Sequence, residues 1–197
     1  LGSAQSGHIA AVGFDLYTRL LSDAVEALRA QRATGLEPTA DEEADDRDRS
    51  GPAAVDLEIP SSIPGDYIED LPTRLEIYRR LGAVSAVKEV ETMENELLDR
   101  FGPLPWQVQN LLYVVRLKLT AGKAGVEAVV REDSRIVLRL HDEVGGARNA
   151  LQRLLGRDTA VGHMQIRLDL ENLSDGWEAP LMSAVEKLAG FRERLGV

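Results

Sequence analysis

The sequence contains no cysteine, only three histidines and few aromatic residues, which make up 5% of the chain. Without cysteine, the chain can form neither a disulfide nor a thiolate metal site. His8, His141 and His163 are scattered and form no His-x-x-x-His pair, which excludes the common zinc ligand sets. No apolar run approaches the ~20 residues that a membrane-spanning helix needs. We therefore expect a cytoplasmic chain that holds no metal and contacts no membrane.

The motifs of catalysis are also missing. The sequence has no GxxxxGK[ST] loop to bind ATP phosphates and no GxGxxG after a predicted strand. No GxSxG motif presents a serine nucleophile. We therefore expect a binding or regulatory module that has no cofactor and is not an enzyme by itself.

The charge is high but mixed, with 28% charged residues and a formal net charge of −10. Such an acidic chain is poorly suited to neutralising phosphates, so we expect no direct DNA binding. Arg74, Arg79 and Arg80 form a basic group near an aromatic side chain, Tyr78. We interpret Arg79 and Arg80 as solvent-facing residues of a structural helix.

Composition divides the chain into three segments. Residues 1–36 begin as a polar loop and continue as an amphipathic helix from about residue 14 to 32, with an apolar stripe from Tyr17 to Leu28. Residues 37–54 contain the acidic run Asp41–Asp46 and almost no large apolar residue, which predicts a flexible linker. Residues 55–197 have the apolar content of a folded domain.

Two periodicities alternate within residues 55–197. Period-two patterns predict strands at 55–59, 126–131, 136–140 and 164–170. Helical patterns predict a helix that begins near Asp70 and Pro72, one at 87–101, one from Pro105 to about Gly122, a short one near Leu151 and a final one. We expect the following side chains to face the core: Leu75, Tyr78 and Leu81; Val87, Val90, Met93, Leu97, Leu98 and Phe101; Val108, Leu111, Leu112, Val115 and Leu119; Leu181, Val185, Leu188 and Leu195. The predicted class is α+β, with a small, mostly antiparallel sheet covered by helices and preceded by the amphipathic helix and the acidic linker.

The helix at 87–101 carries the most informative charges. If its apolar side chains face inward, then Glu89, Glu96, Asp99 and Arg100 face outward together. Taken alone, these residues are typical of a solvated helix face with one Glu-Arg pair worth ~0.3 kcal/mol. The alternative is a charged docking patch that meets arginines of another domain.

Two runs, RLEIYRR at residues 74–80 and ELLDRFGPLP at residues 96–105, resemble hallmark sequences of the C-terminal domain of bacterial transcription-repair coupling factors. The strand VDLEIP at 55–60 is similar to the start of that domain. Upstream, LGSAQSGH at 1–8 and GFDLY at 13–17 resemble the end of the same family's RecG-like translocation motif and the helix after it. The resemblance extends over residues 1 to about 125.

The resemblance implies a role in nucleotide excision repair. In that family, an ATP- and Mg-dependent DNA translocase displaces stalled RNA polymerase and recruits the excision machinery, and its motor motifs lie upstream of this region. The C-terminal domain is understood as a latch that docks on the parent's N-terminal domain and covers the surface for excinuclease A. By this resemblance, Glu96, Asp99 and Arg100 become the candidate interdomain latch. Gln5 and Gly7 match the end of the translocation motif.

Three other interpretations stay open from the residues alone. The chain could be a separate interaction module that dimerises through the stripe at residues 14–28. It could be a small hydrolase that uses two carboxylates such as Glu96 and Asp99, or a nucleic-acid module, which the net charge opposes.

Overall fold

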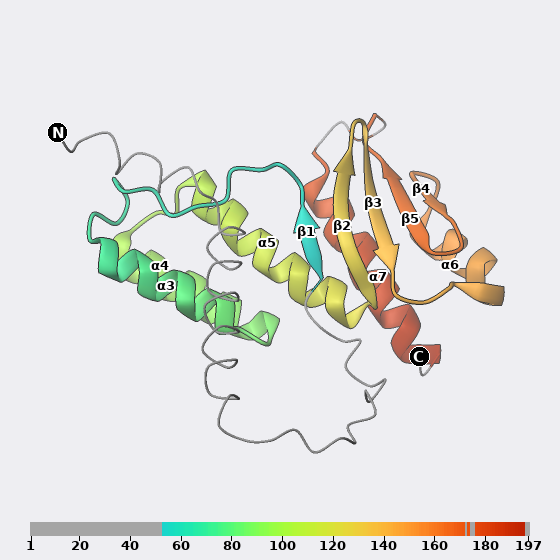
Figure 1. The fold of residues 1–197 in the computed structure, drawn as a ribbon, viewed down its shortest axis with the longest axis horizontal. Coiled ribbons are helices and arrows are strands. Elements are labelled where there is room, and N and C mark those ends of the chain that lie inside the picture. Colours follow the sequence, from blue (N-terminus) through green and yellow to red (C-terminus); the bar gives the residue numbers. More distant parts are fainter. Residues whose placement is uncertain (1–52, 172, 174–175, 196–197) are drawn as a thin grey trace, which may run out of the picture. The chain divides into compact units, whose positions relative to one another are not determined.

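The computed structural model describes residues 53–171, 173 and 176–195. The predictions for Gln5, Gly7, the amphipathic stripe and the acidic run therefore lie outside the described residues. The described chain belongs to two compact units, one formed by residues 60–113 and the other by residues 53–59 and 114–195 (Figure 1).

The first unit is helical. It contains α3 (Leu71–Ala83), α4 (Val87–Phe101) and the beginning of α5 (Trp106–Lys123). Asp70 begins α3 as predicted, since its Oδ2 accepts a hydrogen bond of 2.8 Å from the backbone N–H of Thr73. Gly102 ends α4 at φ +83°, and its N–H donates to the Leu98 carbonyl at 3.0 Å.

The core of this unit is a set of apolar side chains that each helix presents on one stripe. The buried members are Ile77 and Leu81 of α3, Val90, Met93 and Leu97 of α4, and Val108, Leu111 and Leu112 of α5. Two predicted core residues are wrong: Leu75 is 39% exposed and Leu98 is 50% exposed. At 3.6 residues per turn, Leu75 lies more than a quarter turn away from the buried stripe of Ile77 and Leu81. In the same way, Leu98 lies to one side of the buried stripe of α4.

The segment before α3 is attached to all three helices. The backbone N–H of Ile63 donates to the hydroxyl of Tyr78 at 2.7 Å, and the Asn110 amide donates to the Pro60 carbonyl at 3.0 Å. The Tyr67 hydroxyl lies 3.2 Å from the carbonyl oxygens of both Leu97 and Gly102. These bonds fix the C-terminal end of α4, where the candidate site residues lie.

The second unit is built on a five-stranded sheet in the order β1-β2-β3-β5-β4. Its strands are β1 (Ala54–Asp56), β2 (Val126–Glu132), β3 (Arg135–Leu140), β4 (Thr159–Val161) and β5 (Gln165–Asp169). β1 pairs with β2 in parallel, and all other neighbours are antiparallel. The predicted α+β class with a mostly antiparallel sheet is confirmed.

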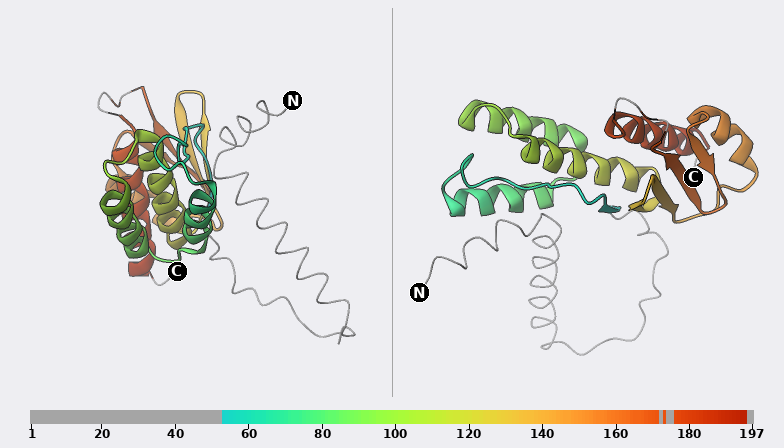
Figure 2. Two further views of the ribbon diagram at one scale, coloured as in Figure 1. Left: turned by 90° about the vertical axis from the view of Figure 1, so that its left-hand side faces the viewer. Right: turned by 90° about the horizontal axis from the view of Figure 1, so that it is seen from above.

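Helices cover one face of this sheet. The C-terminal part of α5 and helix α7 (Glu178–Leu195) lie behind the strands in Figure 1, and Figure 2 shows the same arrangement from the side and from above. A short 3₁₀ turn (Gly145–Ala147) leads into α6 (Arg148–Leu155), which contacts β4 and α7. The covered face is apolar, with Val129, Ile136, Leu138, Ile166 and Leu168 buried. The opposite face carries exposed charged side chains, among them Asp56, Arg139 and Arg167.

Three details of this unit differ from the sequence prediction. The first strand covers 54–56 and not 55–59, because Glu58 adopts a positive φ of 52° and takes the chain out of the sheet. Strand β4 was not predicted. Leu195, expected in the core, is 54% exposed because the C-terminal end of α7 extends past the strands (Figure 1).

Candidate functional site

The three candidate latch residues lie together on the C-terminal half of α4, within the first unit. Glu96 and Arg100 are one helical turn apart, and Nη1 of Arg100 donates to Oε1 of Glu96 at 2.7 Å. Asp99 and Arg100 are exposed, and Glu96 is half-buried. The i,i+4 pair and the shared outward face are therefore as the sequence predicts.

Arg80 of α3 joins these three residues, although the sequence predicts that it faces solvent. Its Nη1 donates to Oε1 of Glu96 at 2.9 Å and its Nη2 to Oε2 at 2.5 Å, a bidentate ion pair between two helices. Its neighbour Arg79 pairs instead with Glu76 on the same helix. Arg80 and Glu96 are sixteen positions apart, so no helical spacing in the sequence connects them.

The two arginines change the titration of Glu96. Hydrogen bonds from Arg80 and then from Arg100 lower the pKa of this carboxyl from 4.5 to about 2. Glu96 is therefore ionised at neutral pH, and both of its oxygens are already engaged. It acts within this cluster as the anion that holds two guanidinium groups in place.

Arg100 is held on its other side by an aromatic contact. Its guanidinium carbon lies 4.9 Å from the centre of the Phe101 ring, and the Tyr67 ring meets Phe101 edge-on at a centroid distance of 6.0 Å. The orientation of Arg100 is thus set by Glu96 and Phe101 together. A side chain fixed in this way loses less entropy when it binds a partner.

The carboxylate of Asp99 is accessible to a binding partner. Its side chain is exposed, and within the described residues that side chain makes no hydrogen bond or ion pair. We call Arg80, Glu96, Asp99 and Arg100 the charged cluster. Its outer surface presents an anion, Asp99, beside a cation, Arg100.

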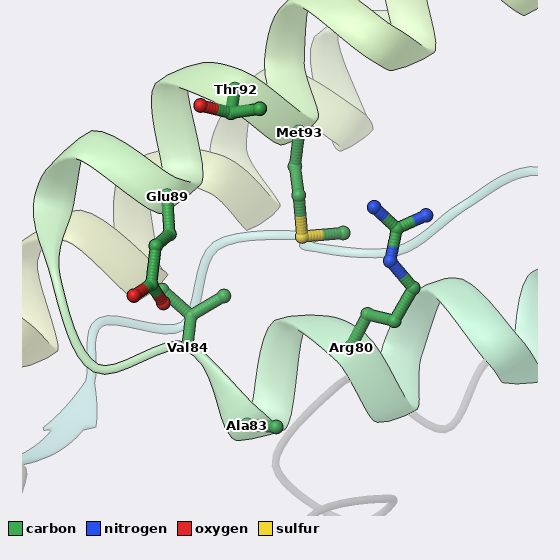
Figure 3. A pocket seen from close by; sticks show the side chains of 6 residues that line it. All are labelled: Arg80, Ala83, Val84, Glu89, Thr92 and Met93. Carbon is green, nitrogen blue, oxygen red and sulfur yellow. The ribbon is translucent and has the colours of Figure 1, made fainter.

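A pocket opens next to the charged cluster, between the C-terminal end of α3 and the N-terminal half of α4 (Figure 3). It has a volume of about 350 Å³ and is lined by Arg80, Ala83, Val84, Glu89, Thr92 and Met93. In Figure 3 the thioether of Met93 lies between the Arg80 side chain and Val84. We call it the α3–α4 pocket; Arg80 belongs both to it and to the charged cluster.

Among the described residues, no three His, Asp or Glu side chains are grouped so that they could hold a metal ion. None of the described helices is long and apolar enough to cross a membrane.

The matches with known proteins agree on one class. The TRCF domain model matches residues 57–149. A solved structure, the crystal structure of the C-terminal domain of transcription-repair coupling factor, superimposes with a TM-score of 0.62 at 26% sequence identity. The match covers 73% of this chain and 96% of that one. Fold and sequence together therefore define an α+β domain of the transcription-coupled DNA repair machinery.

Curated relatives make the assignment specific. The transcription-repair-coupling factor of Mycobacterium tuberculosis is 41% identical over 141 residues, which is 70% of this chain and 11% of the relative. That of Escherichia coli is 39% identical over 126 residues, and that of Bacillus subtilis is 30% identical over 143. The chain belongs to the transcription-repair coupling factor family and corresponds to its C-terminal region. It spans about a tenth of the length of these relatives.

Proposed function

We propose that this chain is a non-catalytic, autoinhibitory domain of a transcription-repair coupling factor. It docks on the N-terminal domain of its parent protein and covers the surface that binds excinuclease A. RNA polymerase, DNA, ATP and Mg concern the parent's other domains and reach this region only indirectly. The observation that carries the proposal is the charged cluster, in which Arg80 and Glu96 hold Arg100 in place beside an exposed Asp99.

The arrangement suits a contact that has to be released. Exposed ion pairs contribute ~0.2–1 kcal/mol each, because water and salt screen them. Changing a closed-to-open ratio from 99:1 to 1:99 needs ~5.5 kcal/mol of differential binding. A docked state held by a few such pairs is within reach of a competing protein partner.

Asp99 and Arg100 require a partner with both charges. Asp99 would meet a cationic side chain of the N-terminal domain, and Arg100 would meet a carboxylate. Such a two-signed pattern discriminates between partners better than a surface of one sign, because a wrong partner places like charges together.

The test is calorimetric titration of this chain with the separately purified N-terminal domain of its parent. Asp99→Arg reverses the exposed charge and should weaken binding about tenfold, equal to ~1.4 kcal/mol. Asp158→Arg, the same change at an exposed position of the second unit, is the matched control and should leave affinity unchanged. Affinity should also fall as NaCl is raised from low to high concentration. Equal affinities for wild type and Asp99→Arg would place docking on another face.

A further inference from the structure

We infer that Arg80 is a positioning residue of the docking surface. It holds the carboxylate of Glu96, and Glu96 in turn holds the guanidinium of Arg100 that meets the partner. Arg80 acts through these two residues and needs no contact with the partner itself. The inference rests on the proposed function and adds to it a residue of a second helix, α3.

The first support is the way in which two arginines share one carboxylate. Oε1 of Glu96 accepts a hydrogen bond from Nη1 of Arg100 at 2.7 Å and another from Nη1 of Arg80 at 2.9 Å. Arg80 also donates to Oε2 at 2.5 Å, so it engages both oxygens, whereas Arg100 engages one. A bidentate pair fixes the plane of the carboxylate, because rotation of that plane breaks one of its two bonds. Arg80 therefore sets the direction in which Oε1 faces Arg100.

The second support is the packing of the two positions that carry this pair. Arg80 precedes Leu81 in α3 and Glu96 precedes Leu97 in α4, and each leucine is 2% exposed. Close-packed side chains of this kind allow little movement of one helix against the other. Figure 3 shows the Arg80 side chain extending from α3 toward α4. The pair of Glu96 and Arg100 lies within one helix, where such pairs are weak by themselves, so the ordering of Arg100 depends on the link to α3.

The third support is electrostatic. Two hydrogen bonds lower the pKa of Glu96 to about 2, and the bond from Arg80 has a larger effect than the bond from Arg100. The same bond to Glu96 raises the pKa of Arg80. The interaction between α3 and α4 is therefore the stronger of the two that Glu96 makes, and it keeps the carboxylate ionised for Arg100.

The alternative is that Arg80 competes with a cation of the partner for Glu96, in which case Arg80 weakens docking. The geometry opposes this role, because Glu96 is half-buried and two guanidinium groups already share its Oε1. A third cation would bring three positive charges around one carboxylate. Asp99, whose side chain is exposed, is the more accessible carboxylate for a cation of the partner. The two roles predict opposite signs for the effect of removing Arg80.

The first experiment measures the order of the Arg100 side chain in the absence of any partner, by NMR relaxation of its Nε–Hε group. Arg80→Met keeps an unbranched apolar side chain and removes the guanidinium, and it should lower the order parameter of Arg100 to below ~0.6. Arg79→Met is the matched control, because it removes the same charge from the neighbouring position, which pairs with Glu76 on α3. It should leave the order parameter of Arg100 unchanged. Equal order parameters in wild type and Arg80→Met would overturn the positioning role.

The second experiment measures docking, by calorimetric titration of each variant into the N-terminal domain of the parent. Melting temperatures confirm that the variants fold. Arg80→Met should weaken binding about fivefold, because Arg100 then loses more entropy on docking, and Arg79→Met should change binding by less than about twofold. In an Arg100→Met background, the addition of Arg80→Met should have almost no effect, since the residue through which Arg80 acts is absent.

The outcomes separate the two proposals. Tighter binding by Arg80→Met than by wild type would show competition for Glu96, and an equal loss in both backgrounds would show a direct contact of Arg80 with the partner. Either result overturns the positioning role and retains the docking function. Binding that Asp99→Arg weakens and Arg80→Met leaves intact does the same. A wild-type chain that shows no binding to the N-terminal domain, even when the two are joined by a flexible linker, overturns the proposed function and with it the role of Arg80 in docking.

Discussion

The guanidinium of Arg192 occupies the space in which residue 125 would carry a Cβ atom. A Cβ built on Gly125 would lie 1.8 Å from Nη1 of Arg192, and Gly125 has a φ of +65°. The backbone conformation requires glycine here, and the Arg192 guanidinium would have to move aside for a Cβ atom. Gly125→Ala should therefore lower the free energy of unfolding by about 2 kcal/mol, measured by urea denaturation.

Two further variants separate the backbone and side-chain contributions to this loss of stability. Gly146→Ala has open space around the new methyl group and no positive φ, and it should change stability by less than about 0.5 kcal/mol. Adding Gly125→Ala to an Arg192→Ala background should cost only the backbone part, about 1 kcal/mol. An equal cost in both backgrounds would show that the side-chain approach has no effect.

The second prediction concerns the pH dependence of the charged cluster. Because the pKa of Glu96 is lowered from 4.5 to about 2, its contribution to stability is complete above pH 4.5 and is lost as the pH falls through 2. Arg80 and Arg100 are 38% and 48% exposed, so screening limits that contribution to about 1 kcal/mol. An NMR titration of the Glu96 carboxyl carbon should give a midpoint near 2, and Arg80→Met should raise it. A midpoint near 4.5 in the wild type would contradict the ion pairs.

The third prediction concerns the connection between the loop and α4. Tyr67→Phe keeps the ring against Phe101 but removes the hydroxyl near the carbonyls of Leu97 and Gly102. It should lower stability by about 1 kcal/mol in urea denaturation. Tyr78→Phe should cost more, about 1–3 kcal/mol, because it leaves the buried N–H of Ile63 without its acceptor. The reverse order would contradict this account of the two hydroxyls.

The fourth prediction concerns Gln152, which joins α6 to β4. Its amide nitrogen donates to the carbonyls of Gly156 and Thr159 at 2.9 Å each, and its oxygen accepts from the N–H of Val161 at 2.9 Å. Gln152→Leu removes all three bonds and should cost about 2 kcal/mol, with faster amide exchange at Val161. Arg153→Leu, at an exposed position of the same helix, should stay within about 0.5 kcal/mol. Unchanged exchange at Val161 would show that β4 is held by other contacts.

The sequence predicts elements that are long or bounded by clear signals. The start of α3 at Asp70, the end of α4 at residue 101 and the two strands that form β2 and β3 are confirmed. β4 has only three residues, too few for a period-two pattern, and the Val161 N–H bonds to the side chain of Gln152, nine positions away. The parallel pairing of β1 with β2 joins residues more than seventy positions apart and leaves no local signal.

The candidate site shows the same division. The grouping of Glu96, Asp99 and Arg100 follows from helical geometry, so the sequence is sufficient for it. The role of Arg80 depends on the register between two helices, and that register is fixed by core packing of residues such as Ile77 and Val90. The ion-pair partners of an arginine such as Arg80 therefore cannot be predicted from the sequence until the packing of the helices is known.

We expect strand β1 to be the first strand of this sheet to separate when the chain is pulled from its N-terminal side. It is an edge strand of three residues, and its pairing with β2 is limited to Ala54, Val55 and Asp56. Tension in the preceding polypeptide would enter the sheet through this short contact, while β2, β3 and β5 are joined by longer antiparallel pairings. Under such tension, β1 should separate from β2 while the other strands of the sheet stay paired.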